Sequence, residues 1–177
     1  MRAGSSLSPP NLAGDLTSRI LYKSKDELLV AAVADLLADL AERPAVVAAK
    51  PGINRMLARV AAVSAQVVAT PAFAETMARA LFQAGKDDHL IGVLLKSAQL
   101  NILNQLRAAE QAGELLPEID LEQTATVLAG HQWSAVLMWS KGLIPLKDFE
   151  EHARRSQLIS LIPLTIDVKK KHLMAAL

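Results

Sequence analysis

The chain has 177 residues, and its 19 basic and 18 acidic side chains leave a formal net charge of +1. This balance excludes a strongly basic nucleic-acid coat and an acidic tail, although it permits a local basic patch. The absence of cysteine excludes disulfides, thiolate zinc sites, iron–sulfur clusters and cysteine nucleophiles. Alanine (30) and leucine (29) make up one third of the chain and aromatic residues only 3%, so the residue types that strands favour are scarce. Composition therefore predicts an all-α protein.

Start and stop signals predict helices joined by short connections. Residues 1–12 are rich in Ser and Pro and predict a flexible leader, and about two helical turns follow over residues 16–21. A capping box at Ser24 and Glu27 opens a helix that Pro44 ends, and a second box at Asp120 and Gln123 opens a helix that Gly142 closes. The expected helices cover residues 25–42, 54–69, 71–84, 88–112, 121–141 and 147–161, and residues 166–177 form a basic tail.

Two segments carry a family resemblance. Residues 21–33 read Leu-Tyr-Lys-Ser-Lys-Asp-Glu-Leu-Leu-Val-Ala-Ala-Val, and Trp139, Gly142 and Leu143 follow a Trp-x-x-Gly-Leu pattern before an amphipathic helix. Both segments, in this order and spacing, resemble TetR-type regulators over roughly residues 21–165. The resemblance implies a helical bundle like the C-terminal ligand-binding and dimerisation domain of that family, over residues 25–165. It also implies a homodimer held by the last two long helices.

The segment 1–24 matches the DNA-binding part of that family incompletely. The family carries a helix-turn-helix upstream of the Ser-Lys motif, in about twice the length found before Ser24. Ala13-Gly14 resembles the turn, and the candidate DNA-contacting residues are Thr17, Ser18, Arg19, Tyr22 and Lys25. A groove-reading helix must be held by its partner helix. We therefore expect 1–24 to be an incomplete or vestigial DNA-binding segment that makes at most salt-sensitive, sequence-independent phosphate contacts. An ordinary solvated leader is the alternative.

The middle helices predict a cavity for a small apolar effector, because they combine many Ala and Val residues with few aromatic ones. Ser97, Asn101 and Gln105 form one polar stripe at four-residue spacing, which lines this cavity or else faces solvent or another helix. The candidate wall residues are Met56, Val60, Phe73, Met77, Phe82, Leu94 and Trp133, with Asn101 or His131 as polar anchors.

The sequence offers little for catalysis. His131 stands alone on its helix face, so it is a core or interface residue or a ligand contact, and no pair of histidines has metal-ligand spacing. Adjacent carboxylates such as Asp87-Asp88 fit helix starts, and no phosphate loop or nucleophile motif is present. We expect no enzyme activity, no metal and no cofactor.

The uncharged run over residues 123–140 favours a homodimer, with Val136, Leu137, Trp139 and Leu158 as candidate interface residues. The same run is too polar for lipid contact on all sides, so we expect no membrane partner. With no apolar run typical of a signal peptide near Met1, the expected location is the cytoplasm.

The resulting hypothesis is a TetR-like, ligand-responsive transcriptional regulator acting as a repressor, which would contact DNA only through a functional or completed N-terminal segment. The alternative is a dimeric helical module that binds a small molecule or a partner but not DNA.

Overall fold

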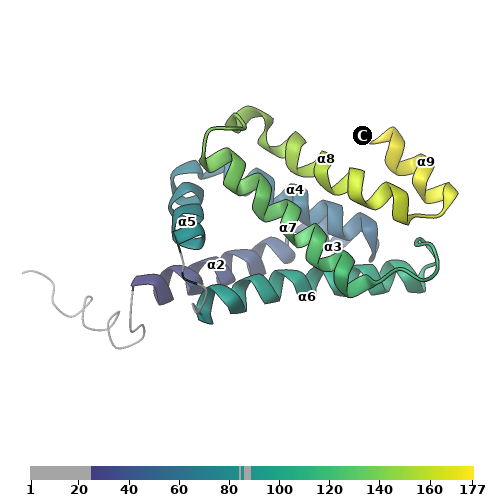
Figure 1. The fold of residues 1–177 in the computed structure, drawn as a ribbon, viewed down its shortest axis with the longest axis horizontal. Helices are drawn as coiled ribbons and strands as arrows, with labels where there is room; N and C mark the ends of the chain where they lie inside the picture. Colours follow the sequence, from purple (N-terminus) through teal and green to yellow (C-terminus); the bar gives the residue numbers. More distant parts are fainter. Residues whose placement is uncertain (1–24, 84, 86–88) are drawn as a thin grey trace, which may run out of the picture.

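The computed structural model describes residues 25–83, 85 and 89–177, and this part of the chain is an all-α bundle (Figure 1). The expected turns at 16–21 and the expected cap at Asp87 or Asp88 lie outside it. The helices are α2 (Lys25–Ala41), α3 (Pro44–Ala48), α4 (Ile53–Ala69), α5 (Pro71–Gln83), α6 (His89–Gln111), α7 (Leu121–Ser140), α8 (Phe149–Leu161) and α9 (Asp167–Ala175), with 3-10 turns η1 (Leu146–Asp148) and η2 (Ile162–Leu164).

Three layers of helices make up the bundle (Figure 1). Helix α6 packs along α7, and α4 packs along α8. Helix α2 lies against both α4 and α6 at the opposite side from α8, while α5 turns by 108° from α4 and crosses to α7. The only extended pairing among the described residues is an isolated antiparallel bridge between Leu115 and Thr165. The predicted all-α helical bundle is confirmed.

Local sequence signals account for the ends of α7. The Asp120 carboxylate accepts a hydrogen bond from the Gln123 backbone N–H at 2.8 Å, as the capping pattern predicts. At the other end Gly142 has φ of +73°, and the N–H of Leu143 reaches back to the carbonyl of Met138 at 2.9 Å. A left-handed residue after the last turn is the usual reason for glycine at this position.

The connection between α2 and α4 contains a helix that the sequence analysis missed. Arg43 is extended, with ψ of 138°, and Pro44 begins the short helix α3 instead of only ending α2. Gly52 then turns the chain into α4 with φ of +105°, and a Cβ atom there would lie 3.2 Å from the backbone of Ala109. Both the backbone angle and the close approach of α6 require glycine.

The segment expected to be a basic tail, residues 166–177, forms helix α9. Its Leu173 is buried in the main core, together with residues of α4, α6, α7 and α8. Lys169 pairs with the buried carboxylate of Glu114 at 3.3 Å, and it donates to the side chain of Asn54 at 2.7 Å. Lys169 therefore has a structural role in holding α9 on the bundle.

Apolar side chains gather in three groups. The largest unites α4, α6, α7, α8 and α9 around residues such as Leu106, Leu128 and Leu158. A second joins α4, α5, α7 and α8, and a third joins α2, α5 and α6 around Met77 and Leu94. No single helix of the described chain is both long and apolar enough to cross a membrane; α4 and α5 reach that length and apolarity only as a pair, bent at their junction.

Candidate ligand pocket

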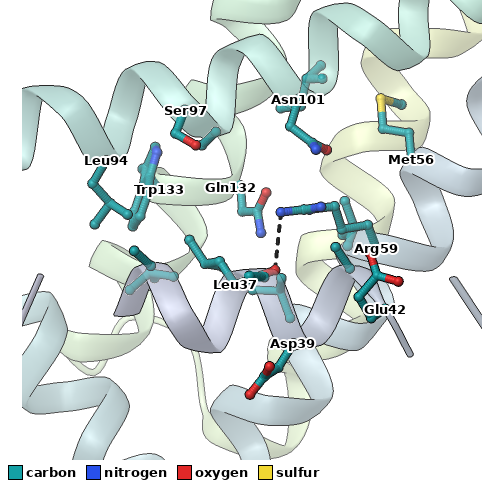
Figure 2. A pocket seen from close by; sticks show the side chains of 18 residues that line it. Leu37, Asp39, Glu42, Met56, Arg59, Leu94, Ser97, Asn101, Gln132 and Trp133 are labelled. Carbon is teal, nitrogen blue, oxygen red and sulfur yellow. Dashed lines mark hydrogen bonds between the residues drawn. The ribbon is translucent and has the colours of Figure 1, made fainter. Parts of the chain in front are cut away.

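A cavity of about 520 Å³ lies between α2, α4, α6 and α7 (Figure 2). This size is within the usual range for small-molecule sites. Each of the four helices contributes small or aliphatic side chains to the wall, and α7 adds the indole of Trp133. The lining residues are Ala34, Leu37, Ala38, Asp39, Ala41, Glu42, Met56, Arg59, Val60, Val63, Leu94, Ser97, Ala98, Asn101, Ile102, Gln132, Trp133 and Val136.

One cation reaches into this cavity. The half-buried side chain of Arg59 extends from α4, and its Nη2 donates to the backbone carbonyl of Leu37 on α2 at 3.4 Å (Figure 2). Burial lowers the pKa of Arg59 because it removes water from the guanidinium. An arginine nevertheless stays protonated in proteins, so the cavity contains a positive charge that is poorly hydrated.

Neutral polar groups lie in the interior of the cavity, whereas carboxylates lie at its rim. Figure 2 shows the guanidinium of Arg59 pointing toward Gln132, with Asn101 and Ser97 on the facing wall. Asp39 of α2 and Glu42, which directly follows α2, are exposed, and the side chain of Asp39 points away from the guanidinium. The interior therefore offers amide and hydroxyl groups beside a cation, while the carboxylates stand at the edge.

A smaller hollow of about 90 Å³ adjoins the cavity. The two spaces share Leu37, Val63, Trp133 and Val136 as lining residues. The remaining wall of the small hollow is almost entirely apolar and comes from α2, α4 and α5. It includes Phe73, Met77 and Leu81. A continuous apolar surface thus runs from the cavity toward α5.

The structure gathers most of the predicted wall residues. Met56, Val60, Leu94, Asn101 and Trp133 all line the main cavity. Phe73 and Met77 line the adjoining hollow. Of the polar stripe, Ser97 and Asn101 face the cavity, while the side chain of Gln105 accepts a hydrogen bond from the N–H of Gly52 at 3.2 Å.

Two predicted contacts need correction. Phe82 lies near the other end of α5, beside Ser140 and Lys141, outside both spaces. His131 turns toward α8, where its Nε2 lies 3.0 Å from the hydroxyl of Ser160. Each error is a shift of one residue in helix phase, since neighbouring positions differ by about 100° around a helix. Gln132 occupies the position in the cavity that was expected for His131.

Arg59 and Gln132 are pocket residues that the sequence analysis missed. Both stand beside residues that it selected, Val60 and Trp133. Arg59 could have been selected from the sequence, because it lies three residues after Met56 on a helix whose inward face is apolar apart from Ser64. A charged residue beside such a face is worth testing as a site residue.

Of the four residues predicted for the dimer interface, two are buried within one chain and two are half-buried. Val136 and Leu158 are buried inside a single chain, with 9% and 0% of their surfaces exposed, so neither can face a second copy. Trp139 packs edge-on against Phe149 with ring centroids 5.9 Å apart, and Leu137 is half-buried. The exposed apolar residues of α7 and α8 are instead Val127 and Ile159, 44% and 60% exposed.

The candidate DNA contacts Thr17, Ser18, Arg19 and Tyr22 lie outside the described residues, and Lys25 is the first residue of α2. Within residues 25–83, 85 and 89–177, no group of three His, Asp or Glu side chains could hold a metal ion.

Comparison with known proteins found no match among family models, curated proteins or solved structures. The TetR resemblance therefore rests on the sequence itself, on residues 21–33 and on the pattern of residues 120–161.

Proposed function

We propose that the chain is a TetR-like, ligand-responsive regulator, a cytoplasmic repressor whose effector binds in the cavity between α2, α4, α6 and α7. The observation that supports this best is the contribution of α2 to the cavity wall. Five lining residues belong to α2, from Ala34 to Ala41, and Glu42 directly follows the helix. Helix α2 begins directly after the candidate DNA-binding segment 1–24.

The position of α2 gives the proposal a mechanism. A ligand changes a conformational equilibrium only when it binds one arrangement better than another. An effector in this cavity contacts α2 on one side and α4, α6 and α7 on the other. Arrangements that differ in the placement of α2 therefore differ in affinity for the effector, and any element attached to Lys25 moves with α2.

The second part of the proposal is a homodimer formed by α7 and α8. Exposed residues of α7 follow one stripe at Gln123, Val127, Gly130 and Ser134, and α8 presents Ile159. The stripe runs beside the hydrogen bond between His131 and Ser160 that joins the two helices. Gly130 has open space where a Cβ would be, which allows another helix to approach closely.

A second candidate function is a dimeric small-molecule-binding module without DNA binding. The observation in its favour is that every lining residue of the cavity lies between positions 34 and 136. Effector binding then needs nothing from residues 1–24.

Selection from random DNA duplexes by the full chain at about 150 mM salt separates the two candidates. A recurring sequence among the bound duplexes supports the regulator. Uniform binding that disappears as salt rises supports the binding module, because phosphate contacts alone carry no sequence information.

A further inference from the structure

Arg59 differs from most arginines of the described chain in having no acidic partner. Arg79, Arg107 and Arg154 each pair with a glutamate at 3.0 to 3.1 Å on the protein surface. Among described residues, Arg59 has no ion pair, and its one hydrogen bond is the long contact to Leu37. A cation that has lost water without gaining an anion is energetically unfavourable.

The surroundings of Arg59 match one kind of anion. The guanidinium presents donors in a fork that fits both oxygens of a carboxylate. The amides of Gln132 and Asn101 line the same space and can donate to a carboxylate oxygen. Two carboxylates at the rim, Asp39 and Glu42, disfavour a ligand with a second negative charge.

Beyond the polar groups, the space continues as apolar surface. In Figure 2, Leu94 and Trp133 lie on the far side of Gln132 from the guanidinium of Arg59. Trp133 also lines the smaller hollow, whose wall continues through Met77 and Phe73. A ligand with its charged end at Arg59 would place an apolar body along this surface.

We propose that the effector is a small amphipathic monocarboxylate, with its carboxylate on Arg59 and its hydrocarbon part against Leu94, Trp133 and the adjoining hollow. This inference rests on the proposed effector pocket and adds the chemical class of the ligand. Because Arg59 also contacts the carbonyl of Leu37, an anion that redirects its donors acts directly on α2.

Calorimetric titration of the full chain with octanoate, 1-octanol and octylamine tests the proposal, because these probes share a chain length and differ in charge. Octanoate should bind at least about tenfold more tightly than 1-octanol, the increment expected for a hydrogen-bonded charge. Arg59→Gln should abolish this preference, and Arg59→Lys should keep part of it. Arg79→Gln, an exposed arginine of α5, is the matched control and should leave all three affinities unchanged.

Each of the other outcomes contradicts one part of the proposal: the carboxylate, the role of Arg59 or the pocket itself. Equal binding of octanoate and 1-octanol overturns the carboxylate while keeping the pocket. Tightest binding of octylamine also overturns it and assigns recognition to Asp39 and Glu42. If a folded Arg59→Gln protein still binds octanoate preferentially, the carboxylate binds at a site other than Arg59. Binding of none of the three, with no change in melting temperature, overturns the effector pocket itself.

Discussion

Arg59 occupies a position where the fold alone would favour an apolar residue. Its neighbours on the inward face of α4 are Met56 and Val60, both buried, and burial lowers its pKa. A desolvated cation with no acidic partner among the described residues contributes little to folding, because its hydrogen bond to Leu37 is long. Ligand-binding positions often retain such unfavourable residues, at some cost in stability.

Substitution Arg59→Met should therefore leave the free energy of unfolding unchanged within about 1 kcal/mol, or raise it. The methionine side chain keeps the apolar part of the contact and removes the poorly hydrated charge. Urea denaturation of the variant and the parent protein measures this. A loss of more than about 2 kcal/mol would show that Arg59 holds α2 and α4 together.

Leu128 provides the opposite case. It is fully buried on α7 in the main core, away from the cavity and the adjoining hollow, so Leu128→Glu places an unpaired charge in the core and should cost about 3 kcal/mol or more of unfolding free energy. Val127→Glu, on the exposed stripe of the same helix, is the matched comparison and should cost under about 0.5 kcal/mol in the folded monomer. Thermal melts monitored by circular dichroism distinguish them; similar melting temperatures would contradict the assigned helix phase.

At the scale of elements, Glu114 joins three parts of the chain. It lies in the connection after α6, its Oε2 accepts the N–H of Ile53 at the start of α4 at 3.4 Å, and its Oε1 pairs with Lys169 of α9. Both charged side chains of this pair are only 11% exposed. The pair is better protected from water and salt than the surface pairs of α5 and α8.

Removing one partner of this pair should loosen α9. Glu114→Ala leaves Lys169 without its carboxylate and exposes the first turn of α4, and it should cost about 3 kcal/mol of unfolding free energy. The rate of amide hydrogen exchange should also increase more in α9 than in the rest of the bundle. Lys171→Ala, an exposed lysine of the same helix, controls for a general loss of basic charge. Equal exchange in α9 of both variants would contradict the role of Glu114.

The helices with strong local signals could be predicted from the sequence. The capping box at Asp120 and the proline–glycine break at Pro51-Gly52 place α7 and α4 within a residue or two of their observed starts. Helices α3 and α9 could not be predicted in this way, because they are short and their stability comes from tertiary contacts. Leu173 alone anchors α9 in the core, and no local pattern marks it among the lysines.

The pocket could be predicted as a region but not residue by residue. Apolar spacing identified α4, α6 and α7 as walls, and five of the predicted residues line the cavity. The phase of each wall helix depends on packing against distant segments. For this reason the polar residue of α7 in the cavity is Gln132 and not the predicted His131. The contribution of α2 was missed for the same reason, since Leu37 faces Arg59 only after α2 has packed on α4.

At the scale of the molecule, the proposed dimer depends on the outer face of α7 and α8. Ile159→Glu should convert the dimer to a monomer in sedimentation velocity at micromolar concentration, because Ile159 is 60% exposed in one chain and apolar. The melting temperature of the monomer at high dilution should not change. Val168→Glu, at an even more exposed apolar position on α9, should leave the dimer intact. A wild-type chain that sediments as a monomer would contradict the proposed dimer.

The shared position of Trp133 has a practical consequence for studying the molecule. Its indole stands between the cavity and the adjoining hollow, whereas the chain's other tryptophan, Trp139, packs against Phe149. Indole fluorescence changes in wavelength and intensity with the polarity around the ring. The protein therefore contains an intrinsic optical reporter at its proposed binding site, and Trp139→Phe would leave that reporter as the single indole.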